Sequence, residues 1–146
     1  DLHWPNIRER VLRLFTHGEL TKGHINYDAD NGIIQVDHGN LSYCVELEGY
    51  EFVRCSLRGE FTNCDFFGCD VNGSDIHSCN FYQSTQVNSS KLESSYVHQS
   101  CILKDCYVYG NGIMKGSMQG GIFRDGKYDK RTAKFDNTEK ILYTEV

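Results

Sequence analysis

A five-residue repeat constrains this chain more than any other feature. From Val45 to Tyr128 a small residue stands two places before a large apolar one, again and again, at a spacing near five. This period matches neither the roughly 3.6 residues of a helical turn nor the alternation of a plain strand. It indicates a chain that turns a corner every five residues. The triplets include Cys64–Phe66, Cys69–Val71, Ser74–Ile76, Cys79–Phe81, Cys101–Leu103, Cys106–Val108, Gly116–Met118 and Gly121–Phe123.

Four such sides would close one coil in about 20 residues, with successive coils about 4.8 Å apart. We therefore predict a mainly β fold, a right-handed, four-sided β-solenoid of about four coils, whose large residues fill a central tube. Steps of four or six residues, such as Phe81 to Val87, are interpreted as bulges at corners. The predicted inward columns are Leu57, Ile76, Val97, Met118; Phe61, Phe81, Leu103, Phe123; Leu47, Phe66, Val87, Val108, Tyr128; and Phe52, Val71, Leu92, Ile113.

These triplets resemble the pentapeptide-repeat family, whose pattern is a small residue, Asp or Asn, Leu or Phe, and two variable positions. The match covers somewhat over half of the chain and is strictest from Cys64 to Phe81. Later the central Asp or Asn becomes Lys91, Tyr96, Ile102 or Tyr107. The resemblance implies a right-handed quadrilateral β-helix, and it implies much less about activity.

We divide the chain into an N-terminal cap (1–44), the solenoid (45–130) and a charged C-terminal tail (131–146). Within the cap, Pro5 followed by Ile7, Val11, Leu12, Leu14 and Phe15 predicts an amphipathic helix that lies over the first coil. Residues 25–36, with Asn31-Gly32 between apolar runs, predict a β-hairpin. Caps are expected because an open solenoid exposes backbone edges and core at its ends.

Length and charge exclude several classes of protein. A chain of 146 residues has room for one core, and a net charge of -5 with scattered Lys and Arg does not favour nucleic-acid binding. It has no apolar run of membrane-spanning length, and the residues at its start do not read as a signal peptide, so we expect it in a virion or in host cytoplasm. It begins at Asp1 without Met, from which we expect processing or trimming.

Six of the seven cysteines fall at the small inward position of a repeat, where they alternate with Ser, Thr and Gly. We expect them to be free thiols selected by volume, because a free Cys packs as a small hydrophobe. No metal site and no cofactor are predicted, since neither paired C-x-x-C motifs nor a Cys/His cluster occurs. His77 and His98 are expected to point outward and to stack one coil apart. The six cysteines are Cys55, Cys64, Cys69, Cys79, Cys101 and Cys106.

Outward apolar residues indicate a protein interface. We expect Tyr82, Ile102 and Ile122 on one side of the solenoid, and Phe67, Tyr107 and Tyr109 on the next. Glu60, Asp65, Asp70 and Asp75 recur every five residues, so on a four-sided tube they would face four sides and form no acidic stripe.

No nucleophile with its base, acid pair in a pocket or phosphate-binding loop can be placed, so we predict a non-enzyme. The segments Asn6–Val36 and Gly120–Lys127 resemble uncharacterised proteins of tailed bacteriophages. We therefore predict a phage-encoded structural or interaction protein that binds another virion protein or a copy of itself. The alternative, drawn from the family resemblance, is an inhibitor that mimics DNA and binds a host topoisomerase or defence protein. A sugar-processing β-helix would need carboxylates in a groove, which a four-sided tube does not obviously offer.

Overall fold

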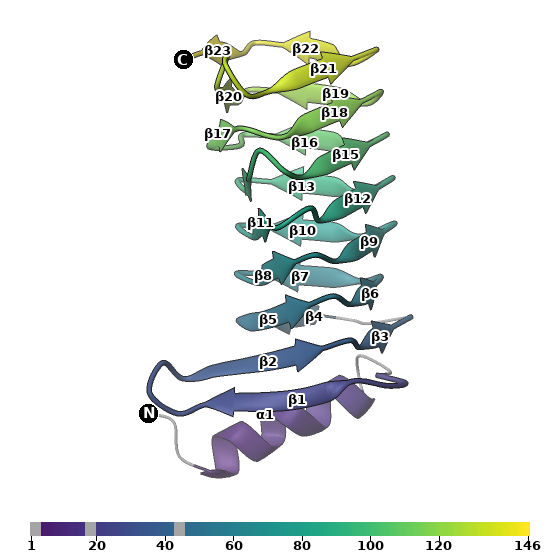
Figure 1. Ribbon diagram of the computed structural model, residues 1–146, viewed down its shortest axis with the longest axis vertical. Coiled ribbons are helices and arrows are strands. Elements are labelled where there is room, and N and C mark those ends of the chain that lie inside the picture. The colour runs from purple at the N-terminus through teal and green to yellow at the C-terminus, as the bar shows by residue number, and fades with distance from the viewer. Residues whose placement is uncertain (1–3, 17–19, 43–45) are drawn as a thin grey trace.

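The computed structural model describes residues 4–16, 20–42 and 46–146 as a stack of short strands closed at one end by a helix (Figure 1). The helix is α1 (Trp4–Thr16), and a hairpin of β1 (His24–Asp28) and β2 (Ile33–Asp37) follows it. The strands after the hairpin are all short. They are β3 (Asn40–Leu41), β4 (Glu46–Glu48), β5 (Tyr50–Val53), β6 (Ser56–Leu57), β7 (Glu60–Thr62), β8 (Asp65–Phe67), β9 (Asp70–Asn72), β10 (Asp75–His77), β11 (Asn80–Tyr82), β12 (Gln86–Asn88), β13 (Lys91–Glu93), β14 (Tyr96–Val97), β15 (Ile102–Lys104), β16 (Tyr107–Tyr109), β17 (Ile113–Met114), β18 (Ser117–Gln119), β19 (Ile122–Arg124), β20 (Lys127–Tyr128), β21 (Lys134–Asp136), β22 (Glu139–Ile141) and β23 (Thr144–Glu145).

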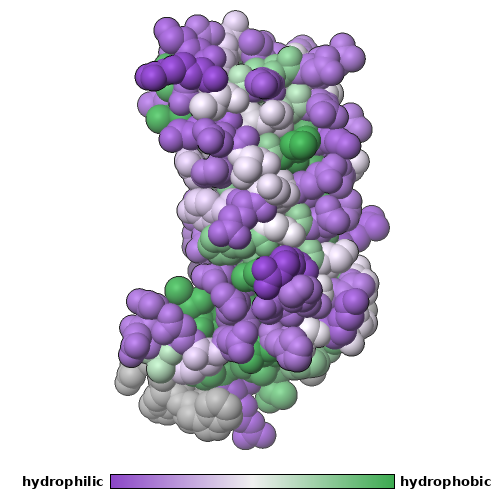
Figure 2. All heavy atoms as spheres, in the orientation of Figure 1, coloured by the Kyte–Doolittle hydropathy of each residue, from purple (hydrophilic) through white to green (hydrophobic). Residues whose placement is uncertain are grey.

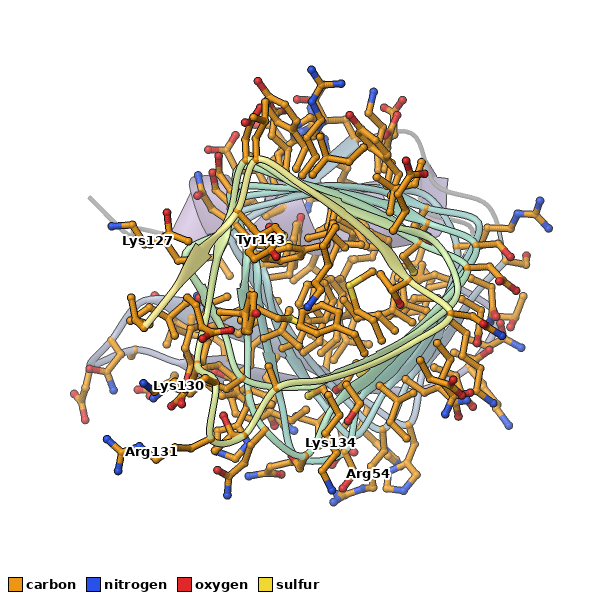
Figure 3. All side chains as sticks on the ribbon, turned by 90° about the horizontal axis from the view of Figure 1, so that it is seen from above. Arg54, Lys127, Lys130, Arg131, Lys134 and Tyr143 are labelled. Carbon is orange, nitrogen blue, oxygen red and sulfur yellow. The ribbon has the colours of Figure 1, made fainter. Side chains whose placement is uncertain are left out.

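These strands form three sheets, and each coil contributes one strand to each sheet. Sheet 1 runs β1-β2-β5-β8-β11-β14-β17-β20-β23, sheet 2 runs from β3 through β6, β9, β12, β15 and β18 to β21, and sheet 3 runs from β4 through β7, β10, β13, β16 and β19 to β22. All neighbouring strands are parallel except β1 and β2, which are antiparallel. Viewed along the stack, the backbone outlines a triangle (Figure 3).

The β-solenoid is therefore confirmed, but the prediction of four sides and about four coils is wrong. The tube has three sides and about seven coils. Phe66 pairs with Phe81, and Phe81 pairs in turn with Val97, so the chain returns to the same sheet after three sides rather than four. The predicted columns therefore mix residues of different sheets: Leu57 belongs to sheet 2 and Ile76 to sheet 3.

The inward columns are nonetheless apolar throughout the central coils. Sheet 2 turns Leu57, Val71, Val87, Leu103 and Met118 inward, and sheet 3 turns Phe61, Ile76, Leu92, Val108 and Phe123 inward. On sheet 1 the predicted inward Ile113 is 40% exposed, and Met114 is buried in its place. Met114, not Ile113, pairs with the inward Val97, so this coil is longer than its neighbour and the inward position is shifted by one place.

Stacked phenylalanines form the centre of the core. The rings of Phe66 and Phe81 are 4.9 Å apart and within 8° of parallel, and Phe52 continues the stack at 5.6 Å from Phe66. Phe61 from sheet 3 meets Phe52 and Phe66 edge-on, at 5.5 and 5.3 Å. Ring separations near the strand spacing of about 4.8 Å show that the coil repeat itself sets the geometry of aromatic contact.

The small corner residues form hydrogen-bonded columns that run along the tube. At eight places a backbone N–H donates to the side chain of the small residue one coil later. The thiol or hydroxyl of that residue also donates to backbone carbonyls; Ser90 Oγ, for example, lies 2.9 Å from the Asn88 carbonyl. The donor–acceptor pairs are Gly39–Cys55 (3.2 Å), Cys55–Cys69 (3.4 Å), Cys69–Thr85 (3.2 Å), Gly59–Ser74 (3.1 Å), Ser74–Ser90 (3.0 Å), Cys64–Cys79 (3.4 Å), Cys79–Ser95 (3.2 Å) and Ser95–Asn111 (3.1 Å).

This arrangement adds a second role for three of the six cysteines, because the sulfur atoms of Cys55, Cys69 and Cys79 accept these hydrogen bonds. All six are buried and free, as predicted, while Cys44 lies outside the described residues. A corner position that accepts such a bond must be small and must also supply an acceptor, because a buried N–H without a partner is costly. Between Cys55 and Asn111 no Ala occupies it, although Ala is small enough.

The predicted caps are present at the N-terminal end. Ile7 and Leu14 of α1 are buried, Arg10 donates to the Gly49 carbonyl at 2.8 Å, and the Tyr50 hydroxyl donates to the Arg10 carbonyl at 2.7 Å. Leu12 and Phe15, which the helix prediction places on the buried face, are about half exposed (49% and 52%). The predicted hairpin is present as β1–β2, and it starts sheet 1.

Residues 131–146, predicted as a tail, form the last coil through β21, β22 and β23. The ammonium of Lys140 lies about 5 Å from the ring centres of Tyr128, Phe135 and Tyr143. Figure 3 shows Tyr143 lying over the interior of the tube. These aromatic residues cover the end of the core.

Candidate interaction surfaces

An aromatic ladder lies on the outer face of sheet 1. Phe67 of β8 pairs with Tyr82 of β11, and their rings stack at 5.1 Å and 18°. Tyr96 and His98 continue the contacts, at 5.9 and 6.4 Å from the Tyr82 ring. All four side chains are half-buried. Because Phe67, Tyr82 and Tyr96 stand on consecutive strands of a parallel sheet, the backbone holds these three rings in place.

Polar pairs run beside this ladder and hold its edge in register. Gln35 donates to Glu51 at 2.6 Å, and Asn80 donates to Asp65 at 2.9 Å, in each case between neighbouring strands of sheet 1. These residues occupy one outward column of sheet 1, and further along it the outward positions are Tyr96 and Lys127. This outward column therefore carries carboxylates towards β2 and a single ammonium, that of Lys127, at β20.

A second group, the tyrosine cluster, lies on sheet 3. Tyr107 and Tyr109 flank the inward Val108 of β16, with their rings 6.4 Å apart and 14° from parallel. Ile122 is the neighbour of Tyr107 on β19, and Tyr109 is 38% exposed. In Figure 2, which shows sheets 1 and 2 rather than this face, apolar colours occupy only small areas between hydrophilic ones.

The predicted grouping of these residues is wrong, although none of the six is buried. Tyr82, Ile102 and Ile122 lie on sheets 1, 2 and 3 respectively, instead of on one side. Phe67 joins Tyr82 on sheet 1, and Tyr107 and Tyr109 join Ile122 on sheet 3. The cause is the three-sided coil. The chain returns to the same sheet after three strands rather than four, so different residues become neighbours on each face.

The same correction applies to the acidic residues. Glu46, Glu60 and Asp75 are direct neighbours in one outward column of sheet 3, so a short acidic column does form. Charge is also divided along the stack. Residues 20–80 contain ten Asp or Glu and three Lys or Arg, whereas residues 81–146 contain seven and nine. In Figure 3, Lys127, Lys130, Arg131 and Lys134 project outward around the C-terminal end.

A shallow groove of about 570 Å³, the corner groove, follows the corner between sheets 2 and 3 across four coils. Its lining includes Arg58, Glu60, Asp75, Lys91, Asp105 and Tyr107, together with Gly59, Gly73, Ser74, Ser89 and Ser90. The expectation that a short solenoid offers no obvious groove is therefore wrong. The sequence could have revealed the groove only once the coil length was known, since its residues come from successive coils.

The histidines do not form the predicted stacked pair. His77 is on sheet 3, where Nδ1 lies 2.8 Å from the Glu93 carboxylate, while His98 follows β14 of sheet 1 and contacts Ser100 at 3.0 Å. Among the described residues, no group of three or more His, Cys, Asp or Glu side chains could hold a metal ion.

The pKa is raised for four of the six described thiols and lowered for two. The hydrogen bond with Cys69 lowers the pKa of Cys55, and the hydrogen bond with Cys79 lowers the pKa of Cys64, although both side chains are buried. Burial raises the pKa of Cys106 to about 11, and burial also raises the pKa of Cys101. The hydrogen bond with Cys55, followed by burial, raises the pKa of Cys69. Since the thiolate is the reactive form, these cysteines are suited to packing.

No helix in the described parts of the chain is long and apolar enough to cross a membrane.

The fold and these surfaces define a three-sided parallel β-solenoid with aromatic groups on two faces and a polar groove along one corner. No protein-family model matches the sequence, and no curated protein matches it. A solved structure similar to this chain is that of QnrB1, a plasmid-mediated fluoroquinolone resistance protein. The two are 14% identical, the match covers 75% of this chain and 88% of that chain, and the TM-score is 0.22. A TM-score this low carries no argument about function, and the fold assignment rests on the strand pairing.

Proposed function

We propose that this protein is a non-enzymatic, phage-encoded interaction solenoid that binds another virion protein or a second copy of itself through sheet 1. The observation that carries the proposal is the aromatic ladder. Aromatic side chains are enriched in protein interfaces, and here the stacked Phe67 and Tyr82 rings stand on consecutive coils of a stiff scaffold. Little ordering entropy is lost on binding to such a pre-organised face.

The division of charge favours a second copy in an antiparallel arrangement. A two-fold axis parallel to the strands, near β11, would pack the ladder of one copy against that of its partner. It would also bring the acidic Glu51 and Asp65 side of one copy towards the basic Lys127 side of the other. A parallel arrangement would oppose like charges, which reduces affinity.

Sedimentation equilibrium of the purified protein over a range of concentrations tests this arrangement. The wild type is expected to dimerise, and Phe67→Ser with Tyr82→Ser is expected to abolish dimerisation, whereas Tyr109→Ser on sheet 3 is the matched control. Glu51→Lys and Lys127→Glu should each weaken the dimer, and the two together should restore it. A monomeric wild type at all concentrations would refute self-pairing. Cross-linking from a photoreactive residue at position 82 in phage particles would then test for a virion partner.

The alternative is an inhibitor that binds a host topoisomerase or defence protein as a DNA mimic. One specific observation favours it, namely the acidic column of Glu46, Glu60 and Asp75, since neighbouring carboxylates can imitate a row of phosphates. A supercoiling assay with purified bacterial DNA gyrase tests it. Inhibition that Glu60→Gln with Asp75→Asn abolishes, and that Asp125→Asn leaves intact, would support the inhibitor over the structural protein.

A further inference from the structure

The corner groove has the dimensions of a ligand site. It crosses β6–β7, β9–β10, β12–β13 and β15–β16, so its lining rises through four coils at about 4.8 Å each. Its volume, about 570 Å³, lies within the range of roughly 300–1,000 Å³ found for small-molecule sites. The groove is straight because the same corner recurs in each coil.

The groove remains hollow because its floor is made of small residues. Gly73 has a φ of +52°, and a Cβ at this position would lie 3.3 Å from the Arg58 guanidinium nitrogens. A side chain there would therefore strain the backbone and displace Arg58. Ser74 and Ser90, on the same corner, are buried and belong to the corner columns.

The backbone of the groove is already hydrogen-bonded to neighbouring coils. Asp75 N–H donates to the Gly59 carbonyl, Lys91 N–H to the Ser74 carbonyl, and Tyr107 N–H to the Ser90 carbonyl, all at 2.9 Å. A peptide therefore cannot bind here by adding a strand, because that mode requires an unpaired sheet edge. Recognition must come from the side chains.

The side chains of the groove are of mixed charge, and three of them are available to a ligand. No hydrogen bond or ion pair joins the side chains of Glu60, Asp75 or Lys91 to any other described residue. The carboxylates of Glu60, Asp75 and Asp105 disfavour the binding of a nucleic acid or another polyanion. The positive charges of Arg58 and Lys91 disfavour the binding of a polycation. A neutral ligand with many hydroxyl groups suits both kinds of charge, since hydroxyls donate to the carboxylates and accept from Lys91. At one end the half-buried ring of Tyr107 can cover an apolar face of the ligand.

We propose that the corner groove binds a neutral oligosaccharide, laid along the solenoid axis with one sugar ring against Tyr107. Sugars present hydroxyl groups around their edge and C–H groups on their face, which is the combination that this lining accepts. The site is independent of the aromatic ladder on sheet 1. It would let the protein hold a glycan while sheet 1 binds a protein.

A microarray of neutral bacterial and plant oligosaccharides, followed by titration calorimetry with the best binder, tests the proposal. We expect at least one neutral oligosaccharide to bind. Tyr107→Ala and Asp75→Asn should each weaken binding about tenfold or more. The matched controls are Tyr96→Ala on sheet 1 and Asp70→Asn on sheet 2, neither of which lines the groove; both should bind as the wild type does.

Two further measurements keep the test decisive. Each variant should unfold at the wild-type urea midpoint, and Ser89→Trp, which fills the groove from an exposed position, should also block binding. Heparin fragments serve as the anionic probe and polylysine as the cationic probe. The proposal is overturned if no neutral oligosaccharide binds, if Tyr107→Ala and Ser89→Trp leave binding unchanged, or if only a charged probe binds at the groove.

Discussion

Replacing Ser90 by Ala tests whether the corner position needs an acceptor or only a small volume. The Ser90 hydroxyl accepts a hydrogen bond from the buried Ser74 N–H at 3.0 Å and lies 2.9 Å from the Asn88 carbonyl. Ala fits the space but leaves this N–H without its partner. A buried donor left unsatisfied costs about 1–3 kcal/mol. Ser90→Cys should cost under about 1 kcal/mol, because sulfur accepts the equivalent bond at Cys69 and Cys79.

Urea unfolding followed by circular dichroism measures the difference. With an m-value of about 2 kcal/mol/M, Ser90→Ala should lower the midpoint by roughly 0.5–1.5 M, and Ser90→Cys by less. Ser56→Ala, at an exposed position on β6, is the control and should stay within about 0.5 kcal/mol of the wild type. If Ser90→Ala is as stable as Ser56→Ala, the acceptor has no role and volume alone explains the small residues.

Three further predictions concern the core and the end of the tube. In the folded protein a thiol reagent should modify Cys44 at most, and the other six cysteines should react only after unfolding in guanidinium, since all six are buried; rapid labelling of more than one thiol would contradict the packing. The hydrogen bond with Glu145 raises the pKa of Tyr128 to about 12, so its stabilising contribution should persist below the ordinary value near 10 and be lost as pH rises from about 10 to 12. In a spectrophotometric titration, Tyr128→Phe should remove a phenol that ionises late, and an unchanged curve would refute the assignment. Phe81→Ala should destabilise the protein by about 3–5 kcal/mol in urea unfolding, because its ring is fully buried in the central stack; a loss below about 1 kcal/mol would contradict this account.

The sequence predicts the tube but not its cross-section. The small–x–large triplets identify the inward residues of most strands, and the Asn31-Gly32 turn and the helix near Pro5 are read from local chemistry. The number of sides cannot be predicted in this way, because a coil of three sides and a coil of four sides repeat the same triplet equally well. Leu, Val, Ile and Phe suit any column, so apolar character cannot distinguish the two.

The surfaces could not be assembled without that number. Phe67 and Tyr82 are separated by three sides and stack in the observed coil, whereas a four-sided coil would place them on different faces. The corner groove and the acidic column depend on the same spacing. The acceptor role of the corner residues has a sequence signal that volume arguments overlook, which is the absence of Ala from Cys55 to Asn111.

Because the corners of one coil take their acceptors from the next coil, a whole coil is the smallest piece that can be copied with its bonds intact. A tandem duplication of residues 71–86 would keep each column in register and lengthen the body by about 4.8 Å. A single inserted residue instead moves the inward position, as Met114 shows. Gene duplication can therefore change the length of this protein in whole steps, which gives evolution a simple means to fit it to the span of whatever it binds.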